Sequence, residues 1–188
     1  MKAIKDPQAL LGDGLAAIRA QFDVPATFPP EALAAAEAAA ARKPEDYADR
    51  TGENFVTLDP AGATDLDQAF AIEAAGGDML LHYAIADVQW FVRDGDPLDV
   101  EAWRRGVTTY LPDGKASLYP AAIGEAAASL LPDGPRPAQI HTVRVAPDGA
   151  VKLDAVERAW IRSRAKLAYE DVARALGFTS VVVKVKSS

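Results

Sequence analysis

The chain has 188 residues, of which 49% are hydrophobic and 25% charged, and its formal net charge is −7. This composition is typical of one folded domain with a short extension, and it excludes a disordered or fibrous protein. The sequence has no cysteine, which excludes disulfides, thiolate zinc sites and cysteine nucleophiles. It also has no apolar run of 18 residues and no secretory signal, so we expect a cytoplasmic protein without a membrane contact.

The acidic residues are concentrated in one part of the chain. Between Glu45 and Glu101 there are 14 acidic and two basic residues, whereas the remainder carries 13 acidic and 18 basic residues. A solvated acidic face is the commoner explanation of such a segment. A metal site is the alternative, and with no thiolate available its ligands would be oxygen atoms or histidines, which makes Mg²⁺ the best candidate.

In chain order, the first predicted elements are helices over residues 7–21 and 30–43, followed by a polar connection to residue 54. A short strand over residues 55–58 precedes a hairpin, in which Gly76-Gly77 joins strands over residues 69–75 and 78–86. Asp87 follows the second of these strands. The next helix has Asp96 as its N-cap and ends at Gly106.

A second hairpin is predicted over residues 141–160, around the turn Pro147-Asp148-Gly149, and a last helix over residues 165–176. Hairpins mixed with helices predict an α+β fold with a mixed, mainly antiparallel sheet and flanking helices. We expect three regions: a helical N-terminal extension (1–50), the main domain (51–177) and a divergent tail (178–188).

Three aspartates, Asp59, Asp65 and Asp67, lie within nine residues between two predicted strands. Carboxylates this close repel one another and raise each other's pKa unless they are solvated, neutralised or bound to a cation. Taken alone, aspartates that form turns and caps are the commoner explanation. A calcium loop starting at Asp65 is excluded, because Phe70 and Gly76 stand where it needs glycine and glutamate.

Five segments, in a fixed order, resemble the catalytic domain of RNase II-type (RNB family) exoribonucleases. They are Thr57 to Ala69 with its aspartates, His82-Tyr-Ala-Ile-Ala-Asp-Val88, the helix from Leu98-Asp99 to Arg105-Gly106 with the Thr109-Tyr-Leu-Pro112 loop after it, Tyr119 to Leu130, and Ile161-Arg-Ser-Arg-Ala-Lys-Leu-Ala-Tyr169. The resemblance covers residues 55–172 and implies the first part of that domain. An arginine that stabilises the scissile phosphate and a second base-clamping aromatic belong to the family's downstream half and have no match here.

The resemblance implies Mg²⁺-dependent hydrolysis of single-stranded RNA from its 3′ end, with release of 5′-mononucleotides. Asp59, Asp65 and Asp67 would bind metal, with Asp65 and Asp67 catalytic. Tyr110 would stack on the terminal base and Tyr169 would hold the 3′ end. Gln68 departs from the family pattern, which has a fourth aspartate there, and Asp87 is a further position of uncertain role.

Arg164 and Lys166 lie in a basic run that also contains Arg162. On a strand these side chains would share one face and could follow an RNA backbone; charge that protects an exposed sheet edge explains them equally well. An incomplete sheet would also favour self-association. Two rival functions stay open: an RNA-binding remnant that does not cleave, and an acidic module stabilised by calcium.

Overall fold

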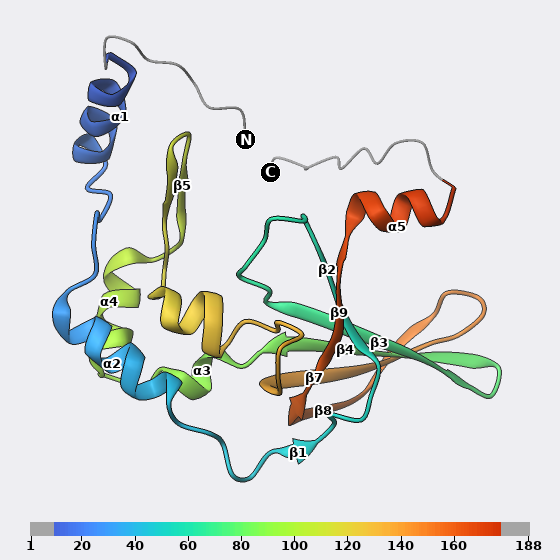
Figure 1. Ribbon diagram of the computed structural model, residues 1–188. Coiled ribbons are helices and arrows are strands. Elements are labelled where there is room, and N and C mark those ends of the chain that lie inside the picture. Colours follow the sequence, from blue (N-terminus) through green and yellow to red (C-terminus); the bar gives the residue numbers. More distant parts are fainter. Residues whose placement is uncertain (1–9, 178–188) are drawn as a thin grey trace.

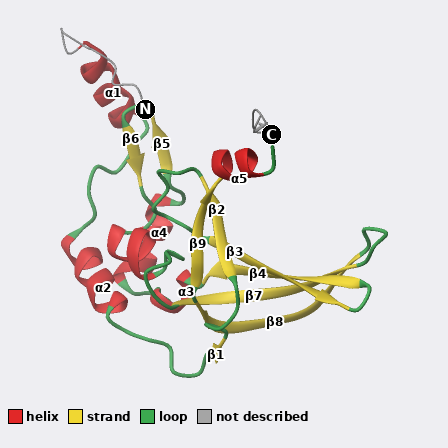
Figure 2. Ribbon diagram, turned by 45° about the vertical axis from the view of Figure 1, so that its right-hand side comes forward, coloured by secondary structure: helices red, strands yellow, loops and turns green. Residues whose placement is uncertain are grey.

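The computed structural model describes residues 10–177. A large sheet occupies one side of the molecule, and most of the helices lie on the other side of the molecule (Figures 1 and 2). In chain order the elements are α1 (Leu10–Gln21), α2 (Pro30–Ala40), β1 (Ala48–Asp49), β2 (Phe55–Asp59), β3 (Gln68–Ala75), β4 (Asp78–Ala86), α3 (Val88–Phe91), α4 (Pro97–Arg105), β5 (Thr109–Leu111), β6 (Gly114–Ala116), the π-helical turn η1 (Ile123–Ala127), β7 (Arg136–Val145), β8 (Val151–Ile161), β9 (Ser163–Ala168) and α5 (Tyr169–Ala175).

The sheet has seven strands in the order β1-β8-β7-β4-β3-β2-β9. Its pairs are antiparallel except for β1 with β8 and β2 with β9, and β5 and β6 form a separate small hairpin. The predicted α+β class with a mixed, mainly antiparallel sheet is therefore confirmed, as are the two helices that precede the sheet.

Local sequence signals explain several of these elements. The β3–β4 hairpin turns at Gly76, whose φ of 67° lies in the region that glycine enters without steric cost. At the start of α4, the Asp96 side chain accepts a 2.9 Å hydrogen bond from the Asp99 amide, and Gly106 ends the helix with φ 73°. Both helix boundaries match the predicted ones.

The predicted helix over residues 165–176 is wrong in its first turn. Ser163–Ala168 is strand β9, which pairs in parallel with β2, and the helix begins only at Tyr169. Alanine, leucine and lysine favour helix locally, but pairing with β2 satisfies the backbone of β9 and overrides that preference. The expected helical residues 7–9 and the expected tail 178–188 lie outside the described residues.

Two groups of buried side chains hold the layers together. One lies under the sheet and includes Phe55, Leu66, Leu130, Ile140 and Ile161. The other joins the helices to η1. No helix within residues 10–177 is both long and apolar enough to cross a bilayer.

Candidate active site

The three predicted carboxylates lie in or next to the connection between β2 and β3, here called the acidic loop (residues 59–67). Leu66, between two of them, is fully buried in the core under the sheet, and its carbonyl accepts a 2.8 Å hydrogen bond from the Leu130 amide. Because the leucine is anchored inward, the flanking side chains of Asp65 and Asp67 stay exposed. The Asp-Leu-Asp spacing thus keeps two carboxylates at the surface while the leucine between them is anchored in the core.

Ser129 holds the same loop from the other side. Its buried hydroxyl accepts a 3.0 Å hydrogen bond from the Leu66 amide and donates one of 2.7 Å to the Thr64 carbonyl. The Asp67 carbonyl accepts a hydrogen bond from the Ala86 amide at 2.9 Å, which ties the end of the loop to β4. The resemblance includes Ser129 only as part of a motif; its role depends on a contact across 63 residues that sequence analysis did not predict.

A pocket of about 230 Å³ opens beside the loop, and Asp65 and Asp67 line it together with Tyr110, Lys115 and Glu125. Tyr110 comes from β5 and its side chain is free in solvent, with 74% of the residue exposed. The structure therefore brings two of the predicted carboxylates and the predicted base-stacking ring to one pocket.

Lys115 is a site residue that sequence analysis did not single out. It lies on β6 directly opposite Tyr110, and its Nζ forms ion pairs with Asp65 and with Glu125, each at 3.0 Å. The ammonium group thus bridges the acidic loop and η1 and connects both to the hairpin that carries Tyr110. In the sequence, the glycine and lysine after the Tyr-Leu-Pro segment predict only a turn. No sequence pattern therefore indicates that Lys115 contacts Asp65 and Glu125.

The carboxylates have different electrostatic surroundings. Burial raises the pKa of Asp59, and repulsion from Asp67 and Asp65 raises it further, partly opposed by Lys166. The hydrogen bond from Lys115 instead lowers the pKa of Asp65. The pKa values of these two acids are therefore shifted in opposite directions, that of Asp59 by burial and repulsion and that of Asp65 by its contact with Lys115.

The donor atoms suit a hard cation. All three predicted ligands offer carboxylate oxygens, the donors that Mg²⁺ prefers, and the repulsion on Asp59 is what a bound cation would relieve. In the described part of the chain, however, no three acidic or histidine side chains are gathered closely enough to hold one ion. Lys115 engages Asp65 instead, so a metal would have to displace that ammonium group.

The two basic side chains predicted to bind RNA donate hydrogen bonds to backbone carbonyls. Arg164 donates to the carbonyls of Thr51 and Glu53, and Lys166 donates to those of Ala61 and Ala63 in the acidic loop. β9, which carries both, is the terminal strand of the sheet. Lys166 therefore fastens the loop that bears the aspartates, and its role toward RNA stays a prediction.

Three predicted residues remain, Tyr169, Gln68 and Asp87. Tyr169 follows Ala168, which pairs with Asp59 in the register of β2 and β9, so it lies at the Asp59 end of the loop. The amide oxygen of Gln68 accepts a hydrogen bond from the Tyr83 hydroxyl. Asp87 is buried, accepts a hydrogen bond from the Tyr47 hydroxyl and pairs with Arg158, and it is not among the residues that line the pocket.

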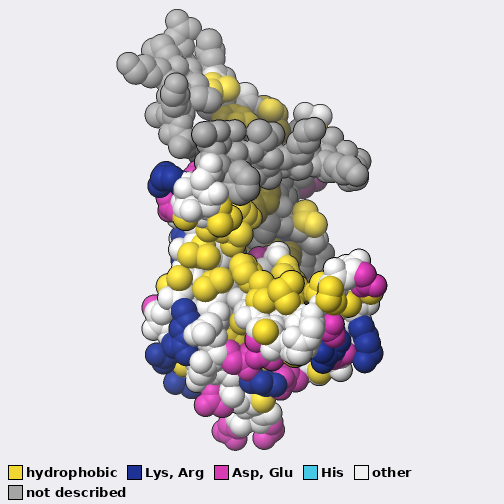
Figure 3. All heavy atoms as spheres, turned by 90° about the vertical axis from the view of Figure 1, so that its right-hand side faces the viewer, with side chains coloured by type: hydrophobic (Ala, Val, Ile, Leu, Met, Phe, Trp, Pro, Cys, Tyr) yellow, Lys and Arg dark blue, Asp and Glu magenta, His cyan; other side chains and the backbone are white. Residues whose placement is uncertain are grey.

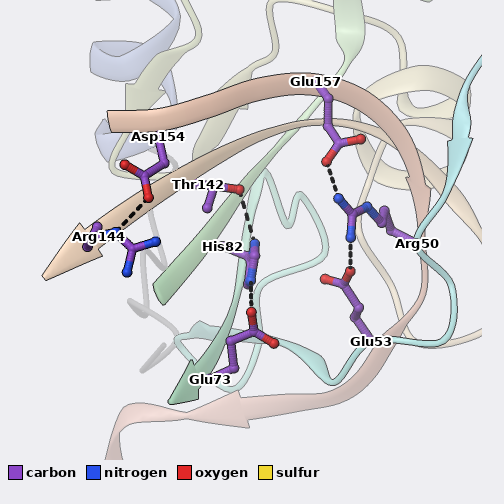
Figure 4. A network of polar contacts seen from close by, with 8 residues as sticks. All are labelled: Arg50, Glu53, Glu73, His82, Thr142, Arg144, Asp154 and Glu157. Atoms are coloured by element: carbon purple, nitrogen blue, oxygen red, sulfur yellow. Dashed lines mark hydrogen bonds and ion pairs between the residues drawn. The ribbon is translucent and has the colours of Figure 1, made fainter. Parts of the chain in front are cut away.

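The two histidines lie outside the pocket lining. Buried His82 stands between Thr142, at 3.1 Å from its Nδ1, and Glu73, at 3.4 Å from its Nε2 (Figure 4). The same view shows Arg144 with Asp154, and Arg50 between Glu53 and Glu157. These contacts form a polar network on the sheet that is separate from the carboxylates of the acidic loop.

Comparison with known proteins identifies the family. Residues 46–186 match the RNB domain. The chain belongs to the RNB family. It is 37% identical over 126 residues to exoribonuclease 2 of Yersinia enterocolitica, a match that covers 66% of this chain and 20% of that protein. Exoribonuclease 2 of Yersinia pestis is 36% identical over the same length and share.

Solved structures of proteins of different kinds share this fold. Mycoplasma genitalium RNase R, solved with ribose-methylated single-stranded RNA, superimposes with a TM-score of 0.77 at 23% identity, over 90% of this chain and 27% of that one. Yeast Ssd1, described as a pseudonuclease, gives a TM-score of 0.61 at 19% identity, over 83% of this chain and 18% of that one. Because one of these structures is of a pseudonuclease, the shared fold alone does not show whether a protein cleaves RNA.

Proposed function

We propose that this RNB-family chain acts in Mg²⁺-dependent 3′-to-5′ hydrolysis of single-stranded RNA to 5′-mononucleotides. The observation that carries the proposal is the acidic loop, whose buried Leu66 and Ser129 contacts hold Asp65 and Asp67 at a pocket shared with Tyr110. Carboxylates held rigidly beside an exposed aromatic ring are what metal-assisted cleavage of a stacked nucleotide requires.

Each residue has a separate task in this proposal. Asp59, Asp65 and Asp67 would hold Mg²⁺, which when bound polarises the phosphodiester and lowers the pKa of an attacking water. Tyr110 would take the face of a base, a contact that every base can make, so degradation would not depend on sequence. Tyr169, at the Asp59 end of the loop, would contact the 3′ ribose, and Arg164 and Lys166 would lie along the RNA backbone only if they left their present carbonyl partners.

An RNA-binding protein that does not cleave is the second candidate. The chain spans 20% of the length of exoribonuclease 2, and the fold is shared with a pseudonuclease. Gln68, in place of a fourth aspartate, removes one negative charge from the loop, which weakens its attraction for metal. Under this alternative the pocket beside Tyr110 would still hold a base.

The two candidates are separated by incubating the full chain with 5′-labelled single-stranded RNA and Mg²⁺, beside Asp67→Asn and the matched control Asp94→Asn at an exposed position outside the pocket lining. Shortening from the 3′ end that only Asp67→Asn abolishes supports the nuclease. Intact RNA that is nevertheless bound supports the remnant. If folded protein, shown by circular dichroism, neither binds nor shortens RNA, both candidates are wrong.

A further inference from the structure

The β5–β6 hairpin stands apart from the large sheet, beside α1 (Figures 1 and 2). Its strand β5 carries Tyr110, the ring that is proposed to stack on a base. A two-stranded hairpin alone is at best marginally stable in water. The position of this ring therefore depends on the contacts that attach the hairpin to the rest of the protein.

Polar contacts attach the hairpin at its turn, at its base and between the two. At the turn, Asp113 pairs with Arg19 of α1 at 2.8 Å. At the base, Arg105 of α4 donates a 3.1 Å hydrogen bond to the Ser117 carbonyl. Between them, Lys115 of β6 connects the hairpin to carboxylates that line the pocket.

Lys115 joins the acidic loop to η1. Its Nζ lies 3.0 Å from Asp65 Oδ2 and 3.0 Å from Glu125 Oε1. The other carboxylate oxygen of Glu125 accepts a 3.1 Å hydrogen bond from the hydroxyl of Thr64, the neighbour of Asp65 in the acidic loop. These contacts close a ring through three segments of the chain, so a cation bound to Asp65 would still leave Lys115 paired with Glu125.

The register of the hairpin couples Lys115 to Tyr110. The two residues are directly opposite each other on β6 and β5. Opposite residues of an antiparallel pair project from the same face, with their Cβ atoms about 5 Å apart. When Asp65 and Glu125 attract Lys115, they therefore turn the Tyr110 side of the hairpin toward the pocket that both side chains line.

The charges on another side of the molecule do not form a path for RNA. On the side to which the tips of the β3–β4 and β7–β8 hairpins point, Lys and Arg side chains lie among Asp and Glu side chains, next to a hydrophobic band (Figure 3). A phosphate backbone binds to a run of cations, which the described residues on this side do not form. Contact with RNA therefore depends more strongly on how firmly Tyr110 is held at the pocket.

We propose that Lys115 is a positioning residue, which keeps the β5–β6 hairpin turned so that Tyr110 faces the pocket. The inference rests on the proposed function, because it concerns how Tyr110 meets a base. Lys115 acts through the ring opposite it and not by contact with RNA. Each ion pair of partly exposed groups changes an equilibrium by a factor of about 1.4–5, so removal of both should favour the displaced hairpin by about fivefold.

Hydrogen exchange tests the position of the hairpin without RNA, in the full chain and in its Lys115→Met and Lys115→Arg variants. Amides of residues 109–116 should exchange about fivefold faster in Lys115→Met, because loss of the ion pairs favours local opening. Lys115→Arg retains the charge and should exchange like the wild type. The matched control Lys152→Met removes a lysine that pairs with Asp154 on the β7–β8 hairpin, and it should leave residues 109–116 unchanged.

The contact with a base is tested with a single-stranded RNA whose 3′-terminal base is 2-aminopurine, in EDTA so that the RNA stays intact. The fluorescence of this base falls when it stacks on an aromatic ring. Lys115→Met should bind the RNA about fivefold more weakly than the wild type, and Lys115→Arg should restore the affinity. In a Tyr110→Ala background Lys115→Met should have no further effect, a result that neither general loss of structure nor direct contact of Lys115 with phosphate would produce.

Three results would overturn the proposal. They are unchanged hydrogen exchange in Lys115→Met, unchanged RNA affinity in Lys115→Met, and an equal loss of affinity with and without Tyr110, which would mean that Lys115 acts on RNA directly. If the wild type does not bind RNA at all, the proposed function is wrong, whereas hydrogen exchange still decides whether Lys115 holds the hairpin.

Discussion

Replacing Lys115 by methionine is expected to tighten Mg²⁺ binding at the acidic loop by about tenfold. In the structure the ammonium group pairs with Asp65 and Glu125 at 3.0 Å each, and Asp65 is one of the proposed metal ligands. A metal ion must therefore compete with a charge that is already present. Methionine retains most of the length of lysine and removes only that charge.

Two contributions set the magnitude. An ion pair between partly exposed groups, such as Lys115 with Asp65, is worth about 0.2–1 kcal/mol, which the metal must replace. A single positive charge about 5 Å from Mg²⁺ adds repulsion of about 1.5 kcal/mol in a water-like dielectric, and salt screens part of it. A net change near 1.4 kcal/mol corresponds to about a tenfold change in affinity.

The assay is isothermal titration with Mg²⁺, or with Mn²⁺ followed by electron paramagnetic resonance. Lys115→Arg, which keeps the charge, should bind metal like the wild type. Lys152→Met makes the same chemical change on the β7–β8 hairpin, where Lys152 pairs with Asp154, and it should also leave the affinity unchanged. If Lys115→Met binds Mg²⁺ no more tightly than the wild type, Lys115 does not compete with the metal for Asp65. If neither the wild type nor any variant binds Mg²⁺, the proposed metal site is wrong.

Three further predictions concern the same region. Leu66→Ala should lower the free energy of unfolding by about 3 kcal/mol in urea, because it empties a fully buried site; a loss under 1 kcal/mol would contradict the anchoring role. Asp59→Asn should stabilise the protein at pH 7 by about 0.5 kcal/mol, because the raised pKa means that the ionised carboxyl is unfavourable in the folded state. This gain should vanish below about pH 4, where the carboxyl is protonated in both the folded and the unfolded protein. Tyr110→Ala should weaken RNA binding by about 1–3 kcal/mol without changing the melting temperature, as its ring is free in solvent; an unchanged affinity would exclude stacking.

Much of the fold follows from local sequence. Gly76, the capping residue Asp96 and Gly106 act within a few residues, through backbone conformations and hydrogen bonds that their side chains dictate. Both hairpins and the helix α4 were therefore predictable. β9 was not, because its strand conformation depends on pairing with β2, more than 100 residues earlier in the chain.

The acidic loop likewise has some features that follow from local sequence and others that depend on tertiary contacts. The sequence by itself determined that Asp59, Asp65 and Asp67 are close together, since short chain separation bounds their distance, and the resemblance singled out Tyr110. Only the tertiary structure decided that Lys115 pairs with Asp65, that Ser129 holds the loop and that Lys166 fastens it. These contacts join residues 50 to more than 100 positions apart, and the way the sheet and helices pack, which no local pattern encodes, brings them together.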